Sequence, residues 1–147
     1  MKDYKLAVVG ATGVVGRTVL KVLEEKNLPI SKYVFFASSK SAGSKLMFMS
    51  KEYTVQELNE SSFNENFDFA IFSAGSNTAK KYAPIAASKG CIVVDNSSAF
   101  RMDKDVPLVV PEVNAETIKN NHGIIANPNC STIQAMLPLK PLNDKYI

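Results

Sequence analysis

Residues 5–16 read KLAVVGATGVVG, a short apolar run that leads directly into a turn with three glycines. Gly10 allows a tight turn off a strand, Gly13 lets a pyrophosphate approach the backbone, and Gly16 lets a helix pack closely on a sheet. The free N–H groups and the dipole at the start of that helix would hold the anionic phosphates. The spacing G-x-x-G-x-x-G varies the usual pattern, and its position between a strand and a helix predicts a dinucleotide-binding turn.

Short apolar runs and helix-length amphipathic stretches alternate along the rest of the chain. This alternation is typical of βαβ units. We therefore predict an α/β fold: a Rossmann-like, doubly wound, mostly parallel sheet with helices on both faces. Strands are expected over residues 5–9, 33–37, 68–73, 91–94 and 123–126, with an antiparallel excursion at 46–55 and an extended segment at 107–110. Helices are expected over 13–26, over 78–88 with Pro84 inside, from Asn114 as the cap to Asn120, and over 131–137.

The composition is that of a soluble globular domain: 147 residues, 46% hydrophobic and 21% charged, with a formal net charge of +3. We expect residues 1–147 to form one dinucleotide-binding domain. Scattered lysines without a dense basic run argue against nucleic acid as a partner. No apolar run approaches the roughly 18 residues of a membrane span and no signal peptide is recognised, so we expect a cytoplasmic protein. Because the two cysteines lack metal-ligand spacing, no metal site is expected.

The stretch after the second expected strand indicates which dinucleotide binds. Residues 37–43 read ASSKSAG, with hydroxyls and a cation where a carboxylate would favour the ribose 2′-hydroxyl of NAD. Ser38, Lys40 and Ser41 instead suit the 2′-phosphate of NADP. The alternative is that Lys40 is only a solvated turn lysine. The residue types favour NADP as the cofactor.

Cys130 follows Asn127, Pro128 and Asn129 and opens an apolar helix. The positive end of the helix dipole favours the thiolate, and unpaired N–H groups there could stabilise a developing oxyanion. Ligands gather at the carboxyl ends of parallel strands, so this cysteine and the glycine turn should share one edge. The alternative is that Cys130 is a small hydrophobic residue of the core, as we expect for Cys91.

Three longer motifs carry a family resemblance: VDNSSAFRMD at residues 94–103, PLVVPEVN at 107–114 and GIIANPNCST at 123–132. They resemble aspartate-β-semialdehyde dehydrogenase, and the likeness extends over the whole chain. It implies reversible, NADP-dependent interconversion of aspartate semialdehyde plus phosphate with aspartyl phosphate, in the biosynthesis of lysine, threonine and methionine. It also implies a homodimer or homotetramer for the full-length protein.

The resemblance assigns roles to individual residues of the site. Cys130 matches the nucleophile, Asn129 its neighbour in the site, and Arg101 the arginine that binds phosphate. A guanidinium fork also suits phosphate on chemical grounds, whereas Arg17 is interpreted as a solvated helix residue. Lys40 stands where many members carry an arginine. The cofactor-binding residues by this pattern are Gly10, Thr12, Gly13, Val14, Val15, Ser38, Lys40, Ser41, Ser73, Ala74, Gly75 and Asn96.

The general acid or base of this chemistry is not expected within the chain. His122, the single histidine, precedes a strand and should lie at its amino end, away from Cys130. In the family, the proton-handling histidine and the substrate and dimerisation domain lie beyond this chain's end. We therefore expect an amino-terminal part of a longer enzyme, inactive alone.

Two other functions stay open. N-acetylglutamyl-phosphate reductase shares the fold and the cysteine chemistry, but its motif usually has glycine in place of Asn129 and an aromatic residue in place of Ser131. The second alternative is a dinucleotide-binding module without catalysis.

Overall fold

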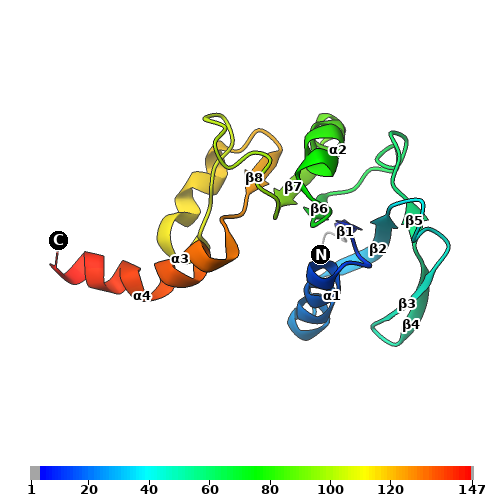
Figure 1. Ribbon diagram of the computed structural model, residues 1–147, viewed down its shortest axis with the longest axis horizontal. Helices are drawn as coiled ribbons and strands as arrows, with labels where there is room; N and C mark the ends of the chain where they lie inside the picture. The colour runs from blue at the N-terminus through cyan, green and yellow to red at the C-terminus, as the bar shows by residue number, and fades with distance from the viewer. Residues whose placement is uncertain (1–3, 147) are drawn as a thin grey trace.

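The computed structural model describes residues 4–146, and its centre is a six-stranded sheet in the order β5-β2-β1-β6-β7-β8 (Figure 1). All neighbouring strands of this sheet are parallel. Counted along the chain within the sheet, the order is 3-2-1-4-5-6, which is that of dinucleotide-binding Rossmann domains. The strands are β1 (Tyr4–Val9), β2 (Ile30–Ala37), β5 (Gln56–Glu57), β6 (Phe69–Phe72), β7 (Ile92–Asp95) and β8 (Ile124–Ala126).

Helices and one hairpin connect these strands. The strands β3 (Lys45–Phe48) and β4 (Lys51–Thr54) form an antiparallel pair, as predicted for residues 46–55. The helices are α1 (Val14–Lys26), α2 (Ser76–Ser88), α3 (Pro111–Asn114) with the 3-10 helix η1 (Ala115–Asn120), and α4 (Cys130–Tyr146). No helix within residues 4–146 is long and apolar enough to cross a bilayer.

The core lies on both faces of the sheet because successive side chains of β1 point to opposite sides. Leu6 and Val8 belong to a buried cluster with Leu20 of α1. Ala7 and Val9 belong to a second buried cluster with three alanines of α2, Ala79, Ala83 and Ala86. Figure 1 shows α1 and α2 on opposite sides of the sheet. The predicted doubly wound fold is confirmed.

The β3–β4 hairpin packs on the α1 side of the sheet through aromatic residues. The ring of Phe48 lies 5.3 Å from that of Phe35 and 4.7 Å from that of Tyr33, both edge-on. All three side chains are buried in the cluster that contains Leu20. The hairpin is therefore held against the sheet next to α1. The packing of these aromatic residues fixes the separation between the hairpin and the helix.

Two boundaries differ from the sequence prediction. The last helix continues to Tyr146 instead of ending near Leu137, because Pro138 and Pro141 lie at exposed positions, where the lost N–H and a bend are tolerated. No residue of α4 is buried. Asn114 is the N-cap residue of η1, which ends at Asn120 as predicted, but it makes no side-chain capping bond. Instead α3 already begins at Pro111, and Asn114 Oδ1 accepts the backbone N–H of Val110 at 2.8 Å.

Candidate active site

Five turns meet at one edge of the sheet because all its strands run in the same direction. They follow β1, β2, β6, β7 and β8, and they begin with Gly10, Ser38, Ser73, Asn96 and Asn127. These turns contain or directly precede every residue that the sequence predicted for the cofactor and for catalysis. The fold thus brings to one edge segments that are more than 100 residues apart in the chain.

The turn after β1 is fixed by close backbone contacts. Gly10 has a φ of +85° and donates its N–H to the carbonyl of Phe36 at 2.8 Å, which ties the turn to the end of β2. A Cβ placed on Gly16 would lie 2.1 Å from the Gly10 carbonyl oxygen. The third glycine is therefore required for packing of the helix against the turn, as the sequence predicted.

The start of α1 is open to an anion. Gly13 is the N-cap residue and makes no side-chain capping bond, and the first turn has no acidic side chain. The first N–H groups of a helix have no partner within it. Val14 is 86% exposed and Val15 45%, so the two residues that follow Gly13 face solvent. This terminus can bind a pyrophosphate through backbone N–H groups and the helix dipole.

A cleft of about 590 Å³ lies next to this helix start, between the turns after β1, β2 and β6. Ser73 at its wall donates its hydroxyl to the carbonyl of Val9 at 3.1 Å. Among the predicted cofactor residues, the cleft is lined by Gly10, Thr12, Gly13, Ser38, Ser73 and Ala74. Val14, Val15, Gly75 and Asn96 do not line it.

Seven residues that line this cleft were not predicted as site residues. Val9, Ala37 and Ser39 adjoin predicted residues in the chain, whereas Glu57, Leu58, Thr78 and Tyr82 come from other segments. Thr78 and Tyr82 lie four residues apart on α2, so they share one face of that helix. The sequence shows this spacing, but it does not show which face of α2 lies toward the cleft. Leu58 follows β5, a two-residue strand too short to be recognised by alternation.

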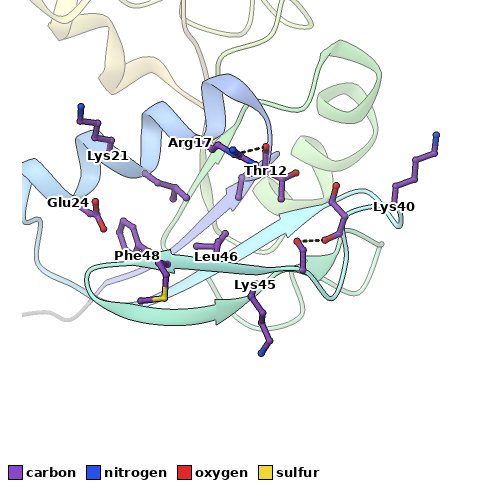
Figure 2. Close-up of a pocket in the computed structure, with 13 residues that line it drawn as sticks. Thr12, Arg17, Lys21, Glu24, Lys40, Lys45, Leu46 and Phe48 are labelled. Atoms are coloured by element: carbon purple, nitrogen blue, oxygen red, sulfur yellow. Dashed lines mark hydrogen bonds between the residues drawn. The ribbon is translucent and has the colours of Figure 1, made fainter.

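Lys40 and Ser41 lie around a neighbouring cavity of about 690 Å³, between α1 and the β3–β4 hairpin (Figure 2). Thr12 lines both this cavity and the cleft, so the two adjoin at the glycine turn. The turn itself is closed by the N–H of Ser41, which donates to the carbonyl of Ser38 at 2.9 Å. The predicted 2′-phosphate residues are therefore distributed between two adjoining spaces.

Cys130 is the first residue of α4, and its side chain is exposed. Asn129 precedes it and caps the helix: its Oδ1 accepts the N–H of Ser131 at 2.9 Å and that of Thr132 at 3.4 Å. The expectation that these first-turn N–H groups are free for an oxyanion is corrected, because Asn129 already satisfies two of them. The N–H of Cys130 has no hydrogen-bond partner within residues 4–146.

Arg101 joins the turns after β7 and β8 beside this helix start. Its Nε donates to the carbonyl of Asn127 at 2.9 Å, and its Nη2 donates to the carbonyl of Asn96 at 3.2 Å. The side chains of Asn127 and Asn96 are also joined, Nδ2 to Oδ1, at 2.7 Å. Since a guanidinium has five N–H groups, these two bonds leave donors for an anion.

Buried Asp95 is a further structural residue that the sequence reading did not single out. It ends β7, and its carboxylate accepts the backbone N–H of Ser97 at 3.0 Å and the Ser97 hydroxyl at 2.7 Å. These bonds fix the turn that precedes Arg101. Both carboxylate oxygens of this fully buried residue are thus satisfied by the turn that they hold.

The second cysteine and the histidine lie away from this edge. Cys91 is buried, and burial together with the charge of Asp68 raises the pKa of its thiol to about 12. His122 is exposed and precedes β8, so it lies at the amino end of that strand. Both predictions, a core Cys91 and a His122 distant from Cys130, are confirmed. No cluster of three metal-ligating side chains is found among residues 4–146.

Known proteins share this arrangement. Residues 5–121 match the family described as "Semialdehyde dehydrogenase, NAD binding domain". The chain is 58% identical over 144 residues to aspartate-semialdehyde dehydrogenase of Aquifex aeolicus (strain VF5). This match covers 97% of the chain and 42% of the Aquifex protein. The solved structure of aspartate semialdehyde dehydrogenase II complexed with ASA from Vibrio cholerae is similar with a TM-score of 0.90 and 46% identity, over 97% of this chain and 47% of the other.

A more distant solved structure, aspartate semialdehyde dehydrogenase with NADP from Candida albicans, has a TM-score of 0.83 and 31% identity, over 97% of this chain and 47% of the other. The chain thus spans less than half the length of the relatives that it matches. These relatives are dehydrogenases and therefore oxidoreductases, and residues 5–121 of the shared region match an NAD-binding domain. The chain belongs to the semialdehyde dehydrogenase family, and its residues 5–121 match the NAD-binding domain of that family.

Proposed function

We propose that the protein containing this chain is an NADP-dependent aspartate-semialdehyde dehydrogenase. The reaction is the reversible reductive dephosphorylation of aspartyl phosphate to aspartate semialdehyde, through a thioester on Cys130. One observation carries the proposal: an exposed cysteine opens a helix at the same sheet edge as an uncapped dinucleotide-binding helix. Relatives with 46–58% identity that bear this enzyme's name support it.

The chain is proposed to be the dinucleotide-binding domain of that protein, with the catalytic cysteine on it. Since the chain spans 42% of the Aquifex aeolicus relative, a substrate and dimerisation domain would be contributed by other residues. We extend the proposal to a cytoplasmic homo-oligomer, a dimer or a tetramer. The domain alone is expected to bind the dinucleotide and not to turn over substrate.

The residues at the sheet edge fit a dinucleotide. The uncapped start of α1 offers backbone N–H groups to the pyrophosphate, with Gly10, Thr12, Gly13, Val14 and Val15 around it. The 590 Å³ cleft between the turns after β1, β2 and β6 has room for the adenosine. The remaining contacts are assigned to Ser38, Lys40, Ser41, Ser73, Ala74, Gly75 and Asn96.

Cys130 supplies the nucleophile of the proposed chemistry. Its thiolate attacks the aldehyde carbon to form a hemithioacetal, and at the oxidised level it holds the acyl group as a thioester. Inorganic phosphate then attacks the thioester carbonyl, and the thiolate leaves with the electron pair of the C–S bond. NADP, when bound, supplies the hydride acceptor. In the biosynthetic direction these steps reverse.

Arg101 and Asn129 prepare the site around this cysteine. Asn129 caps α4 through Ser131 and Thr132, so it fixes the helix start on which Cys130 stands. Arg101 is held by the carbonyls of Asn127 and Asn96 and keeps donors for the incoming phosphate. The proton of the hemithioacetal needs a partner other than His122, which lies at the opposite end of β8.

The test is a kinetic assay of the protein with several substrates. We expect NADPH formation from aspartate semialdehyde only when inorganic phosphate is present, and little formation from N-acetylglutamate semialdehyde. Preference for the acetylated substrate would instead identify N-acetylglutamyl-phosphate reductase. NADP binding without turnover of either substrate would identify a non-catalytic module.

A further inference from the structure

The 690 Å³ cavity beside the dinucleotide cleft carries more positive charge than the predicted NADP residues account for. Its lining contains four cations and one carboxylate: Arg17, Lys21, Lys40, Lys45 and Glu24. The carboxylate of Glu24 is engaged across the cavity, where it accepts the backbone N–H of Met49. The charges that line the space therefore favour an anionic ligand over a cationic one.

Not all four cations are placed to bind such a ligand. Lys45 is engaged on the hairpin, where its Nζ donates to the Thr54 hydroxyl at 2.7 Å and pairs with Glu52 at 3.3 Å. Figure 2 shows Lys21, Lys40 and Lys45 extending away from the cavity. A lysine that turned toward the cavity to bind a ligand would lose conformational entropy of its flexible four-carbon side chain.

Arg17 differs because it is held next to the glycine turn. Its Nε donates to the carbonyl of Thr12 at 3.2 Å, the residue at which the cavity and the cleft adjoin (Figure 2). Its two terminal nitrogens have no hydrogen bond or ion pair within residues 4–146. Arg17 is an exposed residue of α1, as the sequence predicted, but its side chain is oriented by Thr12 and its two terminal nitrogens remain available.

We propose that Arg17 is the residue by which this chain selects NADP over NAD, through a charge-assisted contact with the 2′-phosphate. The inference rests on the proposed function, since it requires the dinucleotide in the cleft. In this fold the ribose hydroxyls lie at the end of the second strand, here Ala37 and Ser38. A phosphate on the 2′-hydroxyl would extend toward the space that Ser41, Thr12 and Arg17 line together.

The chemistry of the two side chains favours Arg17 over Lys40 in this role. A guanidinium presents a planar fork that matches two phosphate oxygens, and the Thr12 contact fixes its orientation before the ligand arrives. Both side chains are exposed, but Lys40 carries a point charge on a flexible stem, and no side-chain hydrogen bond orients it within residues 4–146. Lys40 and Ser41 therefore contribute to the 2′-phosphate site, while Arg17 provides the larger part of the selectivity.

The experiment measures dissociation constants of NADP, NAD, adenosine 2′,5′-bisphosphate and 5′-AMP for the wild-type protein and two variants. Arg17→Gln removes the fork, and Lys21→Gln is the matched control, since it removes one charge from the same helix and cavity. We expect Arg17→Gln to weaken NADP and the bisphosphate roughly ten- to one-hundredfold, as for loss of a charge-assisted hydrogen bond. NAD and 5′-AMP should change less than about twofold. Lys21→Gln should leave all four constants within about threefold.

Three results would overturn the inference. A wild-type protein that binds NAD as tightly as NADP has no selectivity to explain. Loss of NADP affinity in Arg17→Gln no greater than in Lys21→Gln would assign the selectivity elsewhere. Equal weakening of NADP and NAD would show that Arg17 only supports the glycine turn through Thr12. Failure of the wild-type protein to bind either dinucleotide would instead refute the proposed function, and this inference with it.

Discussion

The guanidinium of Arg101 reaches the backbone carbonyl of Asn127, 2.9 Å from its Nε, across the gap between the turns after β7 and β8. Asn127 is only three residues before Cys130 in the chain. The arginine assigned to phosphate therefore also fixes the segment that carries the nucleophile. Binding of phosphate and placement of the thiol depend on the same side chain.

This double role predicts the behaviour of Arg101 variants. Arg101→Lys keeps the charge but cannot span both carbonyls, so kcat should fall and the KM for phosphate should rise, with kcat/KM for phosphate lower by roughly a hundredfold. Steady-state kinetics with varied phosphate measure both. Lys104→Gln, a change of an exposed neighbouring cation, is the control and should leave both constants unchanged. Wild-type kinetics in Arg101→Lys would refute the assignment.

Two glycines of the first turn should respond differently to the same added methyl group. In Gly16→Ala the new Cβ would lie 2.1 Å from the Gly10 carbonyl oxygen, so we expect a loss of unfolding free energy of about 1–3 kcal/mol or more. In Gly13→Ala the nearest atom is 3.4 Å away, so the fold should persist while dinucleotide binding weakens. Chemical denaturation and NADP titration separate the two effects. Equal stability of both variants would contradict the packing role of Gly16.

The cap at the start of α4 can be removed while Cys130 is kept. Asn129→Ala leaves the N–H groups of Ser131 and Thr132 without their acceptor, which costs about 1 kcal/mol for a typical cap. We expect local loosening of the helix start, read as faster amide exchange at these two residues, with a fall in kcat. Asn129→Asp keeps an acceptor oxygen and should retain the protection. Unchanged exchange in Asn129→Ala would contradict the capping role.

The two cysteines should differ in reactivity toward a disulfide reagent. Burial raises the pKa of Cys91 to about 12, so at pH 8 only about one thiol in ten thousand is ionised, and the side chain is also inaccessible. Cys130 is exposed and should react first. We expect one thiol titrated in the native protein at pH 8 and two after unfolding. Rapid modification of two thiols in the native protein would contradict this.

The same raised pKa makes a prediction for stability at high pH. The unfolded state loses the Cys91 proton near the ordinary thiol pKa of 9, whereas the folded state keeps it up to about 12. Over that range the folded state binds more protons, so this group's contribution to stability falls as pH rises. The difference in unfolding free energy between wild type and Cys91→Ala should shrink from pH 8 to pH 11. A difference independent of pH would contradict it.

The alternation of apolar runs and amphipathic stretches was sufficient to predict five of the six strands of the central sheet. β1 is apolar throughout because both of its faces are buried, and the glycine spacing after it has a local steric cause. Local patterns did not predict the length of α4. Proline usually ends a helix, but Pro138 lies at an exposed position of α4, where it is tolerated. Nor did they predict β5, whose two residues pair only because β2 lies next to them.

The sequence predicted the position of a residue whose own side chain suggests its chemistry. It did not predict contacts that depend on residues elsewhere in the fold. Cys130 stands out by its place before an apolar helix, and the structure puts it at the expected edge. The sequence does not show how Arg17 and Arg101 are oriented. The carbonyl of Thr12 holds Arg17, and the carbonyls of Asn96 and of the more distant Asn127 hold Arg101. The Asn129 cap depends on the exact start of α4, which spacing alone does not fix.

The most direct measurement compares wild type, Cys130→Ala and Cys91→Ala in phosphate-dependent NADPH formation from aspartate semialdehyde, with NADP affinity measured in parallel. Cys130→Ala should lose turnover by at least about a thousandfold while binding NADP within about twofold of wild type, because the thiol is needed only for the covalent step. Cys91→Ala should keep its turnover once its folding is verified. Normal turnover by Cys130→Ala would contradict the proposed mechanism.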